Sequence, residues 1–107
     1  MGFFTIKDIK SRKLAQGVEM KVLSGEKMMV VFFHLEPGGA MSEHAHPHEQ
    51  MGIVLEGEVE MVINGEKRIV RQGDAYHIPP GVLHGGSAYG SPARVLDVFV
   101  PPREDYQ

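Results

Sequence analysis

The sequence predicts an all-β protein, an antiparallel barrel or sandwich of short strands. Short runs rich in β-branched and aromatic residues follow one another, and glycine, proline or asparagine closes each of them. No stretch keeps a helical period beyond a turn or two. The 107 residues suffice for one domain with a modest core. We therefore expect a single domain over residues 1–107, with an N-terminal arm at residues 1–16 and a C-terminal tail at residues 101–107.

The strands are predicted from their hydrophobic patterns. Residues 18–22 alternate apolar and polar side chains, which is typical of a half-buried strand. Residues 28–35 are apolar on both faces, so we expect that strand to be covered on both sides. Within the arm, residues 3–16 are expected to be irregular or to form one short strand. The remaining strands are predicted over residues 41–46, 50–55, 58–63, 67–71, 75–78 and 93–100.

Turn signals separate these strands. Asn64-Gly65 is typical of a type I′ hairpin turn. Pro-Pro-Gly at residues 79–81 is a rigid stop for the strand before it. The segment Gly-Gly-Ser-Ala-Tyr-Gly-Ser-Pro at residues 85–92 is predicted to be a loop.

Composition limits the classes of partner. The formal net charge is −3 and no basic patch stands out, which argues against nucleic acid and anionic membranes as partners. The longest apolar run, residues 28–33, is far too short to span a bilayer. There is no cysteine, which excludes disulfides, thiolate metal sites and cysteine nucleophiles and suits a reducing compartment. We expect a cytoplasmic protein whose partner is a small molecule.

Potential metal ligands concentrate in the segment HAHPHEQ at residues 44–50. On an extended strand, His44 and His46 point to the same face. Pro47 has no N–H for the ladder and bends the chain, which brings Gln50 back towards the two imidazoles. Two imidazoles and an amide oxygen form a partial shell for a divalent metal.

His84 is the candidate for the fourth ligand, because the rigid turn before it would hold one imidazole firmly. Glu49 competes with Gln50 for the metal, but the register to Gly57 favours Gln50. The other imidazoles are expected at the surface or behind the ligands; they are His34, His48 and His77.

The last predicted strand carries a carboxylate among apolar side chains. Asp97 shares one strand face with Val95 and Phe99, and burying a carboxylate without a partner is costly. Two interpretations stay open at this point. Asp97 is either a structural residue paired by hydrogen bonds or an acid–base group.

Two clusters of residues together resemble the paired motifs of the cupin superfamily. They are Gly38, His44-x-His46, Gln50 and Gly57, followed by Gly73, Pro79-x-Gly81 and His84. The resemblance implies a cupin-type antiparallel β-barrel, a jelly roll, that holds one divalent metal through His44, His46, Gln50 and His84. Zinc, manganese, nickel and iron all suit such ligands.

The chain departs from the cupin pattern at Gln50, where most cupins have Glu, and at Ala88, where the pattern has Asn. A neutral shell of three histidines and one glutamine leaves the charge of a divalent ion uncompensated. The ion would then favour an anionic ligand, such as a substrate carboxylate.

A narrower resemblance connects residues 46–50, 78–80, 84–85 and especially LDVFVPPRED at residues 96–105 with the pectin-degradation cupins. That family converts 4,5-unsaturated uronates into linear 5-keto-4-deoxyuronates. The resemblance implies Asp97 as the catalytic acid–base group and Phe99 and Arg103 as sugar contacts. Arg103 would also act in catalysis by clamping a carboxylate. A solvated C-terminal charge is the competing interpretation of Arg103.

We therefore expect a metal-dependent, isomerase-like enzyme acting on a small anionic sugar. Two alternatives remain: a small cupin dioxygenase, which needs a redox metal and O₂, and a non-catalytic cupin that binds a small anion or sugar. Met51, Ile53 and Leu55 form an apolar face opposite Gln50. This face predicts a homodimer, because a lone barrel has only one interior.

Overall fold

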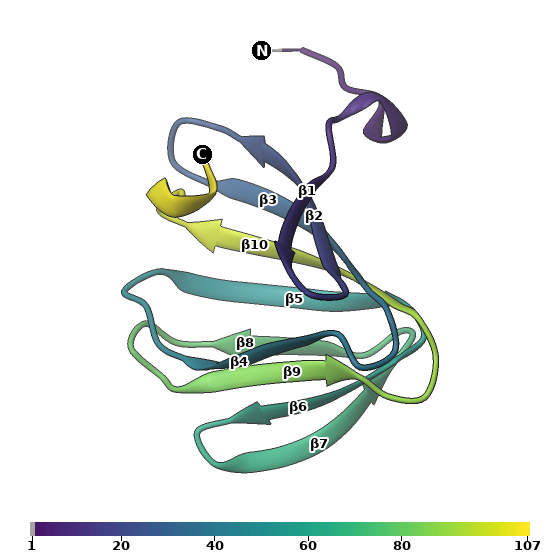
Figure 1. The fold of residues 1–107 in the computed structure, drawn as a ribbon. Helices are drawn as coiled ribbons and strands as arrows, with labels where there is room; N and C mark the ends of the chain where they lie inside the picture. Colours follow the sequence, from purple (N-terminus) through teal and green to yellow (C-terminus); the bar gives the residue numbers. More distant parts are fainter. Residues whose placement is uncertain (1) are drawn as a thin grey trace.

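The computed structural model describes residues 2–107, which form ten β-strands and two short 3₁₀ turns (Figure 1). Their bounds are η1 Ile6–Asp8, β1 Arg12–Ala15, β2 Val18–Ser24, β3 Met29–Leu35, β4 Ala40–His44, β5 Glu49–Glu56, β6 Glu58–Ile63, β7 Glu66–Arg71, β8 Ala75–Ile78, β9 His84–Ala88, β10 Ala93–Val100 and η2 Glu104–Tyr106. No helix among the described residues is both long and apolar enough to cross a membrane. The all-β prediction is confirmed.

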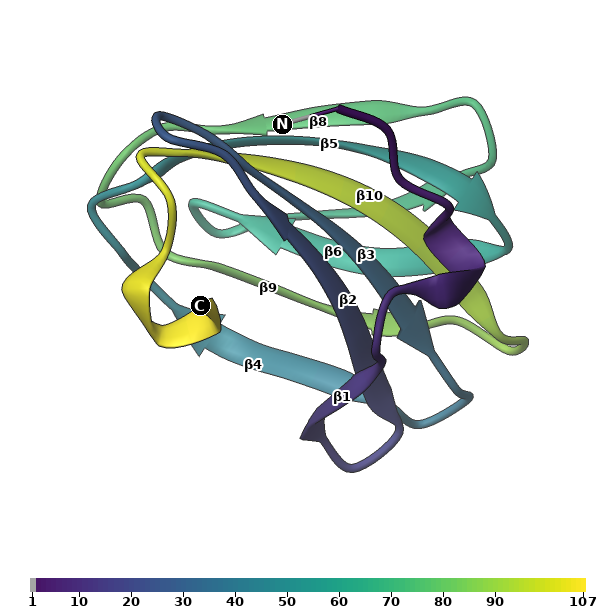
Figure 2. The ribbon, with the colours of Figure 1, turned by 90° about the horizontal axis from the view of Figure 1, so that it is seen from above.

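The strands form two antiparallel sheets that face each other (Figures 1 and 2). The larger sheet has the order β1-β2-β3-β10-β5-β8, and the smaller has the order β4-β9-β6-β7. The last strand, β10, lies between β3 and β5, far from its sequence neighbours. This order places one face of β10 beside the segment that carries the histidines.

The core lies between the two sheets. Along β3 the side chains alternate between buried and half-buried, with Val31, Phe33 and Leu35 facing inward. The prediction that this strand is covered on both sides is thus confirmed for the inner face, whereas the outer face is half-buried. The larger sheet packs on the smaller one through a single face, and its other face is the outside of the barrel.

The predicted loop at residues 85–92 was partly wrong, because residues 84–88 form strand β9 between β4 and β6. The glycines that suggested a loop serve a close approach of two backbones. A Cβ built on Gly85 would lie 2.8 Å from the carbonyl oxygen of Met41 on the neighbouring strand. A glycine inside a strand can mark such an approach as well as a break.

The strand predicted over residues 41–46 ends earlier, at His44. The chain then leaves the sheet, and the N–H of Gly81 donates to the carbonyl oxygen of His46 at 2.8 Å. His46 is thus held by the turn that follows β8 rather than by a strand ladder. The predicted break at Pro47 is confirmed, although it begins two residues sooner.

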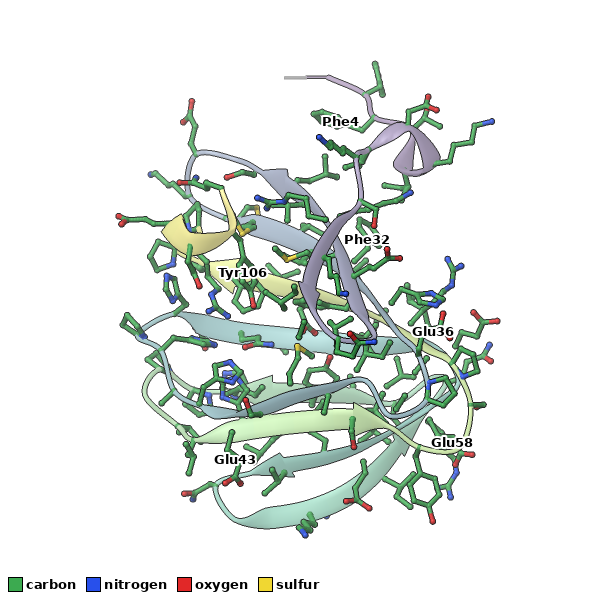
Figure 3. All side chains as sticks on the ribbon, in the orientation of Figure 1. Phe4, Phe32, Glu36, Glu43, Glu58 and Tyr106 are labelled. Carbon is green, nitrogen blue, oxygen red and sulfur yellow. The ribbon has the colours of Figure 1, made fainter. Side chains whose placement is uncertain are left out.

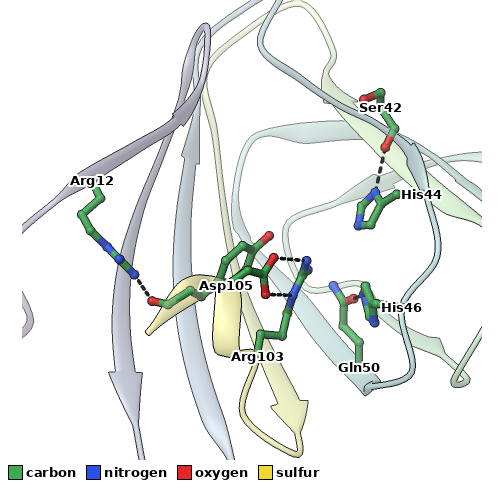
Figure 4. Close-up of polar contacts among 8 residues, drawn as sticks. Arg12, Ser42, His44, His46, Gln50, Arg103 and Asp105 are labelled. Atoms are coloured by element: carbon green, nitrogen blue, oxygen red, sulfur yellow. Dashed lines mark hydrogen bonds and ion pairs between the residues drawn. The ribbon is translucent and has the colours of Figure 1, made fainter.

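Both termini carry more structure than predicted. The N-terminal arm contains η1 and β1; its first residue, Met1, lies outside the described residues. At the C-terminus, η2 folds back on the barrel, and Nη2 of Arg12 donates to the carbonyl oxygen of Tyr106 (Figure 4). The ring of Tyr106 is buried. The tail is therefore anchored to the first strand of the larger sheet.

Candidate functional site

Three imidazoles converge at one end of the barrel. His44 ends β4 and His84 begins β9, and the two are direct partners in the ladder between these strands. His46 follows in the loop after β4. One ring nitrogen from each of the three lies within 4.8 Å of the others. The structure thus brings together the three histidines that the motif spacing singled out.

Backbone contacts orient two of these rings. Nδ1 of His44 lies 2.8 Å from the carbonyl oxygen of Ser42 (Figure 4), and Nδ1 of His84 lies 2.9 Å from that of Val82. A carbonyl only accepts, so each Nδ1 carries the proton and each Nε2 keeps its lone pair free. Nε2 of His84 is buried and has no hydrogen-bond partner among residues 2–107. A divalent metal would satisfy this atom, so the cluster fits a metal.

The environment keeps two of the three imidazoles, those of His46 and His84, neutral. Burial, with the positive charge of Arg103 and the neighbouring His84, lowers the pKa of His46 to about 4. Burial likewise lowers the pKa of His84. The neutral imidazole is the form that binds a metal, so neither His46 nor His84 has to lose a proton near neutral pH.

Gln50, on β5, joins the cluster through its amide oxygen. Its Oε1 lies 3.0 Å from Nε2 of His46 (Figure 4), and its side chain is buried. Glu49 points to the outside, where its carboxylate contacts His77 at 2.8 Å. His34 lies at the surface and contacts Glu36 at 2.8 Å. These two histidines are not part of the cluster.

Asp97 lies directly behind Gln50 and is 1% exposed. Its Oδ2 accepts a hydrogen bond from Nε2 of Gln50 at 2.9 Å, and its Oδ1 accepts one from the hydroxyl of Tyr76 at 2.5 Å. Gly52 is the ladder partner of both Asp97 and Tyr76. A Cβ at Gly52 would lie 1.8 Å from Oδ1 of Asp97, so the absent side chain makes room for the pair.

Burial also tunes the chemistry of this pair. It raises the pKa of Asp97 to about 7, although the hydrogen bonds from Tyr76 and Gln50 oppose the shift. Burial and the adjacent carboxylate raise the pKa of Tyr76 well above its usual range. Near neutral pH, the carboxyl group of Asp97 can therefore both accept and release a proton, while Tyr76 remains a donor.

Sequence reasoning missed Tyr76. The alternation of residues 75–78 indicates that Tyr76 and Ile78 share a face, and both are buried in the structure. Nothing in the local pattern shows that the hydroxyl meets a carboxylate 21 residues away.

Arg103 is buried at the same end of the barrel, with only 8% exposure. Its guanidinium carbon lies 4.0 Å from the ring centre of Tyr106 and 5.3 Å from that of Phe99. Asp105 holds it through two hydrogen bonds, at 3.2 and 2.9 Å (Figure 4). The Tyr106 ring in turn packs edge-on against Phe33 and Phe99. Figure 3 shows Tyr106 at the C-terminal turn η2. The interpretation of Arg103 as a solvated terminal charge was therefore wrong.

These groups border one pocket between the sheets. Its lining includes His44, Gln50, His84, Asp97, Phe99 and Arg103. Three potential metal ligands, a carboxyl group with a pKa near neutrality and one cation thus surround the same pocket. Ala88, where the cupin pattern has Asn, is a buried strand residue and lies outside this lining.

A two-sheet barrel with converging histidines at one end defines the class of protein. The family model described as "Cupin domain" matches residues 31–99, and the chain belongs to the cupin family.

Within the cupin family, this chain is similar to several individual proteins. The pectin degradation protein KdgF of Dickeya dadantii (strain 3937) is 33% identical over 96 residues, which cover 88% of this chain and 87% of that protein. The structure of KdgF from Halomonas sp. has a TM-score of 0.94 and 29% identity and covers 100% of this chain and 99% of that one. An RmlC-like cupin from Shewanella frigidimarina NCIMB 400 also has a TM-score of 0.94, with 27% identity and coverage of 100% and 96%.

Proposed function

We propose that this protein is a metal-dependent enzyme that converts 4,5-unsaturated uronates to linear 5-keto-4-deoxyuronates in the breakdown of pectin or alginate. One observation carries the proposal. A buried carboxyl group, Asp97, with a pKa near 7 lies beside a metal-type histidine cluster in a chain similar to KdgF. A cytoplasmic location stays a prediction, supported by the absence of cysteine.

His44, His46, Gln50 and His84 would hold one divalent ion, which is zinc, manganese, nickel or iron. Such an ion supplies Lewis-acid polarisation of a substrate oxygen when it is bound. The three imidazoles and the amide oxygen carry no negative charge, so a substrate carboxylate is a favourable partner for the loaded site.

The remaining residues supply binding and proton transfer. Arg103 has five N–H groups, and Asp105 occupies only two of its nitrogen atoms. The other N–H groups would bind the carboxylate of the uronate, with Phe99 beneath the guanidinium. Both residues line the pocket that Asp97 borders.

Asp97 would move one proton. Opening the cyclic uronate breaks the bond between the ring oxygen and the anomeric carbon, and the anomeric hydroxyl becomes a carbonyl. The hydroxyl proton is lost, and one proton is added at the unsaturated carbon 4, so the reaction is an isomerisation. One group that first takes and then returns a proton is sufficient for this change.

The test is a ring-opening assay on purified protein loaded separately with each of the four metals. We expect unsaturated galacturonate to disappear and a linear keto product to form, without O₂ uptake. Oxygen consumption would instead indicate the dioxygenase alternative. Stabilisation of the protein by the sugar without turnover would indicate the binding protein. Either result would overturn the proposed reaction.

We further propose a homodimer formed through the outer face of β5. Met51, Ile53 and Leu55 are 56%, 44% and 39% exposed on this face. Leu96 and Val98 lie next to them on β10 as ladder partners of Ile53 and Met51. A continuous apolar surface of this kind suits a second copy of the chain, since a two-fold axis pairs the same patch with itself.

Replacing Ile53 with Glu is expected to convert the dimer into a monomer, because two symmetry-related carboxylates would be buried close together. Light scattering at micromolar concentration measures the change. Lys67→Glu, an exposed substitution on β7 in the other sheet, is the control and should remain dimeric. A monomeric wild-type protein would refute the proposal.

A further inference from the structure

Gln50 stands where most cupins have a glutamate, and its surroundings indicate why. Both ends of its amide are engaged within the buried site. Oε1 lies 3.0 Å from Nε2 of His46, and Nε2 donates to Oδ2 of Asp97 at 2.9 Å. The side chains of Gln50 and Asp97 are 6% and 1% exposed, so water does not replace these contacts.

The contact with Asp97 dictates which way the amide faces. In its ionised form, Asp97 only accepts hydrogen bonds, and its second oxygen already accepts one from the hydroxyl of Tyr76. The NH₂ end of Gln50 therefore faces the ionised Asp97, and its carbonyl end faces the histidines. The reverse orientation would place oxygen against oxygen and turn the NH₂ group towards the metal ligands.

We propose that Asp97 positions the carbonyl oxygen of Gln50 for the metal, and that the carboxylate at position 97 is the reason an amide stands at position 50. The inference rests on the proposed metal site and adds a positioning role for Asp97 to its proposed acid–base role. Gln50 and Asp97 then form a matched pair, in which the amide donates a hydrogen bond and the carboxylate accepts it.

Single substitutions break this match, and the double substitution restores it. Gln50→Glu places two carboxylates face to face across the present hydrogen bond. Gln50 and Tyr76 donate to different oxygens of Asp97, so in Asp97→Asn the NH₂ group faces one of these two donors. In the double variant, the NH₂ group of Asn at 97 donates to Glu at 50, and its oxygen accepts from Tyr76. The hydrogen bond between positions 50 and 97 is then restored with its direction reversed, and Tyr76 still donates to position 97.

The experiment is a double-mutant cycle in zinc affinity, measured by competition titration on wild type, Q50E, D97N and Q50E/D97N. A carboxylate is a stronger ligand than an amide, so Q50E is expected to strengthen zinc binding in the D97N background. In the presence of Asp97, this gain should be lost. The fold-changes in the two backgrounds are expected to differ by about 10–100-fold, the usual effect of contacts that orient a metal ligand. Equal fold-changes would overturn the proposal.

The melting temperature of the metal-free proteins provides a second readout. Q50E is expected to melt below wild type, and Q50E/D97N above Q50E. A Q50E protein that fails to fold while the double variant folds also supports the pair, whereas two unfolded proteins would contradict it.

Tyr76→Phe is the matched control for the zinc titration. It removes a hydrogen bond to Asp97 but leaves the contact with Gln50, so its zinc affinity should stay near that of wild type. Turnover does not enter this test, so a failed ring-opening assay and a failed cycle are distinct results.

Discussion

Asp97→Asn is expected to lower turnover of the unsaturated uronate by about 10²–10⁴-fold, the usual scale for removing an acid–base group. The amide keeps the shape of the carboxyl group but exchanges no proton near neutral pH. The site makes this substitution informative, since Asp97 is buried and hydrogen-bonded on both oxygens, and its pKa is raised to about 7. Water therefore has little access to replace the missing group.

The control for this prediction must separate proton transfer from metal loss, because Asp97 also contacts Gln50. Turnover is therefore measured at saturating metal and expressed per metal-loaded protein. The double variant Q50E/D97N, in which the metal ligand is again matched, should remain inactive. If Asp97 is only structural, Asp97→Asn will lower the melting temperature while the folded fraction turns over substrate at a rate near wild type.

His84→Ala is expected to remove nearly all bound metal, with a loss of metal affinity beyond about 100-fold. Losing a residue that only orients a metal ligand already lowers the affinity by up to about that factor. His84 is held by its ladder pairing with His44 and by the carbonyl oxygen of Val82, and its Nε2 is a buried nitrogen without a hydrogen-bond partner among residues 2–107. No neighbouring side chain among residues 2–107 supplies a fourth imidazole to the cluster.

Elemental analysis after reconstitution and the metal-induced shift in melting temperature measure this effect. At a free metal concentration of about 1,000 Kd, bound metal adds about 4 kcal/mol to the free energy of unfolding of wild type, and this stabilisation should disappear in His84→Ala. His77→Ala is the matched control, because His77 is an exposed residue whose side chain contacts Glu49 outside the cluster. Full metal occupancy in His84→Ala would contradict the assignment of the site.

Local spacing determined the identity of the ligand cluster. His44 and His46 are two residues apart, Pro47 ends the extended segment, and Gln50 opens the next strand. The turn at residues 79–81 places His84 opposite His44. Each relation depends on a few neighbouring residues whose backbone preferences are strong, so the sequence predicts it.

The sequence predicted strand β10 and its buried face equally well, because alternation alone places Val95, Asp97 and Phe99 on one side. The sequence did not predict β9, since glycine is depleted in strands. Glycine suits this strand only because the backbone of β4 lies so close to it. Local patterns describe a residue's own strand and leave open which strand lies beside it.

Only the tertiary structure decided what Asp97 and Arg103 contact. The order of the larger sheet brings β5, β8 and β10 together, so that Asp97 meets Gln50 at a separation of 47 residues and Tyr76 at one of 21. The turn η2 and its anchor on Arg12 bury Arg103 beside Phe99. Residue types and their spacing therefore determined the candidate metal ligands, whereas the pairing of distant strands decided how the proton-transfer and carboxylate-binding groups are arranged around them, because hydrogen bonds across a sheet depend on strand order and register.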